Sequence, residues 1–229
     1  MRMSTLTLAV TAGAALLGAA SIPAGAAPGR DRTREGAVTA SELLAEVTSC
    51  SRVSRGKYRT DHGSPATVPV CGLKGAVFWK ADMDIDCDGQ VTAHCNRTAD
   101  PWFQSQTAFT QSDGRPLVSE KLPYVVVPGP SALWDYRAAG LKGGSVVAVV
   151  HGDRVGYAVV GDTGPREIIG EASYAAARSL GVDPDPATGG TAAEVTYILF
   201  TGSRVRPIED HGAAVALGQR LAEQFLRDN

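Results

Sequence analysis

The chain has 229 residues, of which 44% are hydrophobic and 20% are charged, and its formal net charge is -2. This length predicts one domain with a sizeable core, and the composition excludes global disorder. The near-neutral charge argues against a nucleic-acid-binding protein, because such proteins usually carry a strongly basic face. Only the N-terminus contains a long apolar run, so we expect no membrane-spanning segment in the rest of the chain.

Residues 1–26 have the order of a secretory signal peptide. Arg2 precedes an apolar stretch over 6–22, and Ala24-Gly25-Ala26 forms a small-residue cleavage site. Glycines interrupt the apolar stretch and no basic stop-transfer segment follows it, which disfavours an anchor helix. We therefore predict a secreted, extracellular protein with a flexible polar arm over 27–37 and a single catalytic domain over 38–229.

Three helices are predicted from caps and apolar spacing. The first begins at the capping-box pattern of residues 39–42, and the second covers 174–180 between the cap Ser173 and the stop Gly181. The third, near the C-terminus, has one apolar stripe formed by Ala214, Leu217, Leu221 and Phe225.

Six short runs rich in β-branched residues predict strands between these helices. They cover residues 76–79, 122–127, 145–150, 157–160, 167–169 and 195–200. Each run is bounded by Gly, Pro or Asp, and residues 151–154 have the composition of a hairpin turn. The sequence therefore predicts a mainly β domain with a few helices, an α+β fold.

The cysteines of the chain are Cys50, Cys71, Cys87 and Cys95. An even number in an exported chain predicts two disulfides. Three pairings are possible, and Cys50–Cys71 with Cys87–Cys95 is favoured because both close short loops. A zinc site is the alternative, but the chain has no C-x-x-C or H-x-x-x-H spacing, so we expect no metal there.

The common catalytic and cofactor motifs are absent from the sequence. It has no G-x-S-x-G elbow, no H-E-x-x-H helix, no P-loop and no G-x-G-x-x-G turn. The four histidines, at positions 62, 94, 151 and 211, are scattered. We therefore expect neither a Ser-His-Asp hydrolase nor a bound cofactor.

An acidic run at residues 82–89, DMDIDCDG, places Asp82, Asp84, Asp86 and Asp88 at every second position. In a strand these side chains share one face and repel one another unless a cation or a cationic ligand is bound. The run also copies the start of a calcium loop, although Cys95 occupies the twelfth position, where a bidentate glutamate belongs. A groove for a positively charged substrate and a solvated turn without a ligand are the other two interpretations.

A second acidic feature consists of Asp162 at the end of one predicted strand and Glu171 before a helix. A hairpin between them would bring the two carboxyl groups together, as glycosidic bond cleavage requires. The competing interpretation is structural: Asp162 hydrogen-bonds its own turn, and Glu171 interacts with the helix dipole.

The chain resembles the secreted chitosanases of glycoside hydrolase family 75. The resemblance rests on ADMDIDCDG at 81–89, DPWFQSQT at 100–107, LPYVVVP at 122–128, VVGDTGP at 159–165 and IGEAS at 169–173. It implies that Asp162 and Glu171 are the catalytic acids of an endo-acting enzyme that hydrolyses the β-1,4-glucosamine linkages of chitosan. It also implies inversion, and therefore carboxyl groups roughly 6.5–9.5 Å apart with a water between them.

The stretch over 159–180 also resembles the end of a double-psi β-barrel, which implies such a core with an open acidic groove. The amines of chitosan are protonated in mildly acidic solution, so Asp82, Asp84 and Asp86 would attract the polymer. Trp102 is the expected stacking face for a sugar ring, and Thr163, in the motif of Asp162, is a further expected substrate contact.

Phe103, Tyr124 and Trp134 are aromatic alternatives to Trp102 that are equally suited to the core. The expected partner is chitosan or chito-oligosaccharide, bound by a monomer. Two other functions stay open: a non-catalytic, expansin-like polysaccharide-binding module and a lytic enzyme that acts on peptidoglycan.

Overall fold

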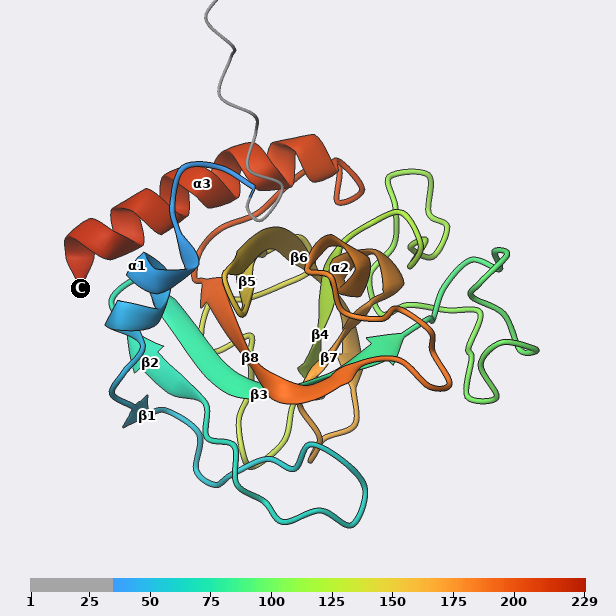
Figure 1. Ribbon diagram of the computed structural model, residues 1–229, viewed down its shortest axis with the longest axis horizontal. Coiled ribbons are helices and arrows are strands. Elements are labelled where there is room, and N and C mark those ends of the chain that lie inside the picture. The colour runs from blue at the N-terminus through green and yellow to red at the C-terminus, as the bar shows by residue number, and fades with distance from the viewer. Residues whose placement is uncertain (1–34) are drawn as a thin grey trace, which may run out of the picture. The chain divides into compact units, whose positions relative to one another are not determined.

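Eight strands and three helices make up the described part of the chain, residues 35–229 of a computed structural model (Figure 1). The predicted signal peptide and residues 27–34 of the predicted arm lie outside the described residues. At the end of that arm, a Glu35 carboxylate oxygen accepts a hydrogen bond from the backbone N–H of Tyr157 at 2.8 Å. The other Glu35 oxygen lies 3.1 Å from Nε2 of His211.

Strands make up most of the regular structure, which confirms the predicted mainly β class. The strands are β1 Ser51–Arg52, β2 Cys71–Leu73, β3 Ala76–Asp86, β4 Tyr124–Pro128, β5 Val146–His151, β6 Arg154–Gly164, β7 Glu171–Ser173 and β8 Thr191–Phe200. The helices are α1 Ala40–Glu46, α2 Tyr174–Ser179 and α3 His211–Asp228. None of the described helices is long and apolar enough to cross a membrane.

Six of the strands close into a barrel, as the sequence led us to expect. They pair in the order β3-β7-β4-β6-β5-β8, and β8 pairs back with β3. The β3–β7 and β4–β6 pairs are parallel, and the other four pairs are antiparallel. The short strands β2 and β1 extend the sheet outward from β3.

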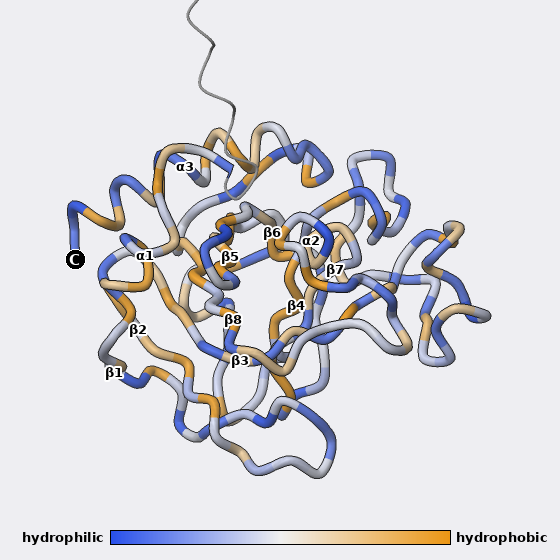
Figure 2. Tube along the Cα trace, in the orientation of Figure 1, coloured by the Kyte–Doolittle hydropathy of each residue, from blue (hydrophilic) through white to orange (hydrophobic). Residues whose placement is uncertain are grey.

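The two faces of the barrel wall bury different cores. Side chains from all six strands, among them Trp79, Val160 and Tyr197, form the interior cluster. The outer face carries a second cluster that packs against α1 and α3, where Phe225 meets Phe200 edge to face. Figure 1 shows α3 lying across the outside of the barrel, and Figure 2 shows the hydrophobic residues concentrated along strands such as β4 and β6.

The helix caps form as predicted. Thr39 and Glu42 make the reciprocal capping box of α1, and Ser173 accepts a hydrogen bond from the backbone N–H of Ala176 in α2. Gly181 follows α2 with a φ of +71°. A residue without a Cβ adopts this left-handed conformation easily, and it ends the helix.

The buried stripe of α3 is rotated from the predicted one. Ala214 and Phe225 are buried, but Gly218 and Ala222 are buried in place of the larger Leu217 and Leu221, which are half-buried. The reason is close packing on β6, because a Cβ on Gly218 would lie 2.3 Å from the ring of Tyr157.

The predicted hairpin between the two acidic motifs is wrong. Residues 167–169 form no strand, β7 begins only at Glu171, and β6 and β7 do not pair with each other. Instead β4 lies between them, parallel to β6 and antiparallel to β7. The strand predicted over 76–79 is also longer than expected, because the acidic run continues it to Asp86.

Candidate active site

Asp162 and Glu171 lie on the outer face of the barrel, on either side of β4. Val126 is the register partner of Asp162, and Val125 is the partner of Ala172. Continuing that antiparallel register by one residue sets Val126 beside Glu171. Neighbouring strands are about 4.8 Å apart, so the backbones that carry the two acids are roughly 10 Å apart.

A β-bulge turns Asp162 outward. The β4–β6 register shifts between the Val125–Val160 pair and the Val126–Asp162 pair, which leaves Gly161 as the extra residue. In a regular strand without the bulge, Asp162 would share the inward face of Val160, because residues two positions apart point to the same side. A Cβ on Gly161 would lie 2.5 Å from the Cβ of Tyr124, so this position requires glycine.

The acids of β3 lie on the same outer face. They alternate with Ala81 and Met83, which point into the interior cluster. Asp84 is the direct register partner of Glu171 in the parallel β3–β7 pair, and its backbone N–H donates to the carbonyl oxygen of Gly170 at 2.8 Å. The predicted strand geometry of the acidic run is thus confirmed for Asp82, Asp84 and Asp86.

These strands and the adjoining loops enclose a pocket of about 720 Å³. Seven carboxyl groups of the described residues line it: Asp61, Asp84, Asp86, Asp88, Asp100, Asp162 and Glu171. None of its described lining residues is a lysine or an arginine, and His62 is the one basic side chain among them. The walls of the pocket therefore carry strongly uncompensated negative charge.

Asp162 is buried and held by backbone donors. Its Oδ1 accepts hydrogen bonds from the N–H groups of Ala108 and Thr163, each at 2.7 Å. Burial raises the pKa of Asp162 above the usual value, while the two hydrogen bonds act in the opposite direction because they favour the ionised carboxylate. Thr163 also lines the pocket.

Glu171 has the opposite surroundings, because no described residue donates a hydrogen bond to its carboxylate. Burial raises its pKa to about 7, and the negative charges of Asp84 and Asp162 add to the rise. A carboxyl group with this pKa keeps its proton in mildly acidic solution. The two acids therefore differ in hydrogen bonding: Asp162 accepts two backbone hydrogen bonds, and Glu171 accepts none from the described residues.

Asp86 and Asp88 lie close to Asp162, and carboxylate oxygens of the three residues lie within 4.8 Å of one another. Asp86 accepts a hydrogen bond from the backbone N–H of Asp88, and Asp88 accepts one from that of Gln104. Burial followed by the charge of Asp162 raises the pKa of Asp86 well above its usual value. Burial raises the pKa of Asp88 to about 6. Mutual repulsion among three carboxyl groups this close opposes their simultaneous ionisation.

Asp82 is placed differently from the other acids of the run, since it does not line the pocket. Its carboxylate lies within 4.8 Å of those of Asp61 and Asp84, and its Oδ1 is buried without a hydrogen-bond partner against Gly170. Burial raises the pKa of Asp82 to about 7, followed by the charges of Asp84 and Asp61.

The calcium-loop motif within the run does not fold as a calcium loop. Asp84 and Asp86 belong to strand β3, and their carboxylates fall into two different groups. Asp84 gathers with Asp61 and Asp82, whereas Asp86 and Asp88 gather with Asp162. A loop that wraps one ion needs these side chains to converge.

Among the candidate aromatic residues, Trp102 alone is exposed at the pocket. Its exposed fraction is 87%, whereas Phe103, Tyr124 and Trp134 are buried. The backbone N–H of Trp102 donates to Oδ1 of the buried Asp100 at 2.8 Å, which fixes the loop that presents the indole.

Both favoured disulfides form. Cys50 pairs with Cys71, and Cys87 pairs with Cys95. Cys87 lines the pocket directly after β3, so the second disulfide closes the start of the long segment between β3 and β4.

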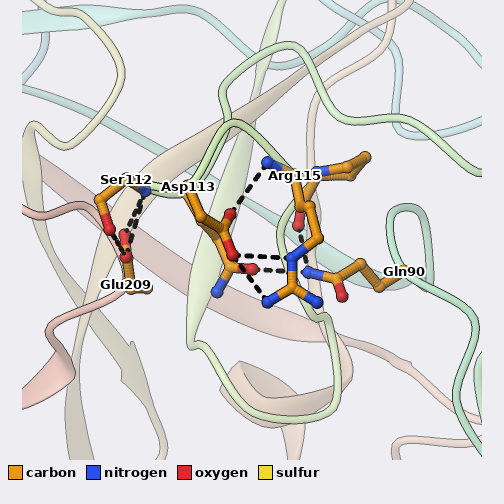
Figure 3. Close-up of polar contacts among 7 residues, drawn as sticks. Gln90, Ser112, Asp113, Arg115 and Glu209 are labelled. Carbon is orange, nitrogen blue, oxygen red and sulfur yellow. Dashed lines mark hydrogen bonds and ion pairs between the residues drawn. The ribbon is translucent and has the colours of Figure 1, made fainter.

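The segment between β3 and β4 also supplies the N–H group of Ala108 that binds Asp162. Hydrogen bonds at Ser112 attach this segment to another part of the chain. Figure 3 shows Ser112 bound to Glu209 through both its backbone N–H and its hydroxyl group. In the same view Asp113 pairs with Arg115. The side chain of Gln90 donates to the carbonyl oxygen of Pro116 at 2.7 Å. The turn around Ser112 is therefore anchored to the chain that precedes α3.

Several residues of the pocket were not assigned to the site from the sequence. Asp88 belongs to the alternating acidic run, so the sequence pattern was sufficient to suggest that it lies at the site. Asp61, Asp100 and Gln104 lie on loops, and no periodic pattern relates them to the strands.

A six-stranded barrel with a buried carboxyl pair in an acidic pocket is an arrangement suited to the hydrolysis of a sugar polymer. Residues 83–226 match the family described as fungal chitosanase of glycosyl hydrolase group 75. The chain belongs to this family.

Curated relatives agree with this family. The chain is 30% identical to Endo-chitosanase C of Aspergillus oryzae over 192 residues, which are 80% of this chain and 48% of that protein. It is 31% identical to Endo-chitosanase B of Aspergillus oryzae (strain ATCC 42149 / RIB 40) over 69% of this chain and 73% of the relative. It is 32% identical to Endo-chitosanase of Aspergillus fumigatus over 56% of this chain and 59% of the relative. The chain thus spans about half the length of Endo-chitosanase C.

Proposed function

We propose that the protein is a secreted endo-chitosanase that hydrolyses β-1,4-glucosamine linkages by inversion. The observation that carries this proposal is the pocket around Asp162 and Glu171, which seven carboxyl groups and no described lysine or arginine line. A polymer with protonated amines offsets this charge, whereas a neutral or anionic polymer does not. The names of the relatives, all endo-chitosanases, support the same substrate.

Glu171 is the proposed general acid. Its raised pKa, about 7, keeps the proton that the glycosidic oxygen must receive as the bond to the anomeric carbon breaks. Its position between Asp84 and Val126 sets the carboxyl group in the middle of the acidic face.

Asp162 is the proposed general base. The two backbone N–H groups that bind its Oδ1 favour the ionised form, which accepts a proton from water while that water attacks the anomeric carbon. Strands two positions apart fit a carboxyl separation of roughly 6.5–9.5 Å, which leaves room for the water and predicts inversion.

The other proposed substrate contacts surround this pair. Trp102 offers a sugar ring a flat exposed face, and Thr163 lies beside the base. Asp84 and Asp86 face the pocket and attract the amines, while Asp82 adds negative charge from behind Asp84. The protein is proposed to act as a monomer outside the cell, after removal of residues 1–26.

The test compares the wild type with Asp162→Asn and Glu171→Gln on chitosan. We expect release of new reducing ends by the wild type and a loss of about a thousandfold or more in both variants, with unchanged circular dichroism. Asp153→Asn, in the β5–β6 turn away from the pocket, is the matched control and should remain active.

Binding of chitosan without new reducing ends in the wild type would overturn the enzymatic proposal in favour of a binding module. Muramidase-type products from purified cell wall, with chitosan left intact, would point to a peptidoglycan lytic enzyme. Products with a retained anomeric configuration, followed by NMR, would contradict inversion.

A further inference from the structure

Asp84 holds a position that no other acid of the pocket shares. It is the register partner of Glu171 across the β3–β7 pair, and parallel register partners point to the same face. It is also exposed, whereas Asp162 is buried and Asp82 lies behind the pocket surface. A ligand that contacts Glu171 from solvent therefore meets Asp84 next.

The order of the strands places Asp84 on one particular side of the cleaved bond. Across the outer face the sequence of side chains is Asp162 on β6, Val126 on β4, Glu171 on β7 and Asp84 on β3. In an inverting reaction the base and its water lie on one side of the anomeric carbon, and the acid lies at the leaving oxygen. Asp84 is beyond the acid, so it lies on the side of the departing sugar.

We propose that Asp84 determines specificity by binding the C2 ammonium group of the sugar that leaves with the oxygen protonated by Glu171. This inference rests on the proposed function. It adds to that function the sugar that is recognised, the departing one, and the chemical group that is recognised, its C2 ammonium. The carboxylate forms a charge-assisted hydrogen bond with a glucosamine ammonium group. An N-acetylated sugar offers a neutral acetamide instead, whose single N–H group carries no charge to offset that of Asp84.

No cation of the described residues pairs with Asp84. Its carboxylate lies within 4.8 Å of those of Asp61 and Asp82, which increases the local attraction for a cation. The negative charge of Asp84 also contributes to the raised pKa of Glu171. An ammonium group bound at Asp84 offsets that charge and makes Glu171 a stronger acid at the moment of proton transfer.

The test uses partially N-acetylated chitosan and mass-spectrometric sequencing of both new chain ends. In the wild type, we expect glucosamine alone at the new non-reducing ends, because these come from the departing sugar. Asp84→Asn should admit N-acetylglucosamine at those ends and lower kcat/KM on a fully deacetylated hexamer by about tenfold. The reducing ends should not change.

Two variants control for charge and for general effects. Asp84→Glu keeps the carboxylate and should preserve glucosamine at the non-reducing ends, while Asp153→Asn should match the wild type throughout. Unchanged product ends in Asp84→Asn, or a relaxation at the reducing ends, would overturn the role of Asp84. If the wild type does not cleave chitosan at all, the proposed function itself fails, and that outcome is distinct from the other two.

Discussion

Asp162 and Glu171 flank the same residue, Val126, from the two strands on either side of β4. The spacing between the backbones of Asp162 and Glu171 is therefore set by three neighbouring strands, β6, β4 and β7, and not by the conformation of a loop. Strand spacing varies little among proteins, so the distance between the two backbones that carry these acids is well fixed.

The pH dependence of activity follows from the opposite surroundings of the two acids. As the proposed general acid, Glu171 must be protonated, so activity should fall as pH rises through about 7. As the proposed general base, Asp162 must be ionised, so activity should also fall as pH drops through its pKa, which burial raises above the usual value. NMR of the side-chain carboxyl carbons measures the pKa of Glu171 without interference from the substrate amines. The signal of Glu171 is identified as the one that is missing in the Glu171→Gln variant. A Glu171 pKa below 5 would contradict the assignment.

The same raised pKa predicts that Glu171 lowers stability at alkaline pH. In the folded chain its pKa is about 7, against a usual value of 4.5, so the folded state binds more protons than the unfolded state between these values. Stability should fall as pH rises through that window. Glu171→Gln should remove this contribution and be more stable than the wild type by about 3 kcal/mol at pH 8, with little difference at pH 4. Urea unfolding at both pH values measures the free energy of unfolding of the wild type and the variant. An equal difference between the two proteins at pH 4 and at pH 8 would refute the prediction.

Gly164 leaves room for the carboxyl group of Glu171. A Cβ at this position would lie 2.6 Å from Oε2 of Glu171 and 3.0 Å from Cγ1 of Val126. Gly164→Ala should therefore displace the carboxyl group and lower kcat by about ten- to a hundredfold, with an intact fold. Gly212→Ala, in the first turn of α3, is the control and should retain activity with equal or higher stability. Full activity of Gly164→Ala would show that Glu171 tolerates movement.

Trp102 should affect binding and leave stability unchanged. Its side chain is 87% exposed, so Trp102→Ala removes little buried area, but it removes the proposed stacking face. We expect KM for chitosan to rise roughly five- to tenfold, with unchanged kcat and melting temperature. Trp134→Ala, at a buried position, should instead lower stability by about 3–5 kcal/mol. An unchanged KM in Trp102→Ala would exclude the stacking role.

The two disulfides should separate stability from activity. Cys50–Cys71 spans 21 residues and Cys87–Cys95 spans 8, so loop-closure entropy assigns them about 3.3 and about 2.5 kcal/mol. Replacing both cysteines of the first pair with alanine should cost more stability. Replacing those of the second should cost more activity, because Cys87 lines the pocket. Denaturant unfolding and kcat/KM, measured on both double variants, check this; the reverse order of activities would contradict it.

Local patterns in the sequence were sufficient for several features. The caps at Thr39 and Ser173, the β-rich class and the alternation of the acids along β3 are all fixed within a few residues. The barrel was expected from a resemblance over 159–180, and the closed order of the strands agrees with it. The disulfide pairing was a preference for short loops, and it is confirmed.

The features that the sequence did not predict depend on contacts between distant segments, which the periodicity of apolar residues along the chain does not encode. The hairpin between Asp162 and Glu171 was wrong because β4, from a segment about 40 residues earlier, inserts between the two strands. The rotation of α3 depends on contact between Gly218 and Tyr157. The position of Asp82 behind the pocket depends on the backbone of Gly170. In each case a residue distant in sequence decides the outcome.

Gly161 has a consequence for how such a protein could gain or lose its chemistry. If Gly161 instead paired regularly with Val126, β6 could still close the barrel, but every later residue of the strand would change faces. Asp162 would then point among the apolar side chains of the barrel lumen, away from the pocket. The exposure of this carboxyl group to a polymer therefore depends, by this geometry, on which residue the strand leaves unpaired.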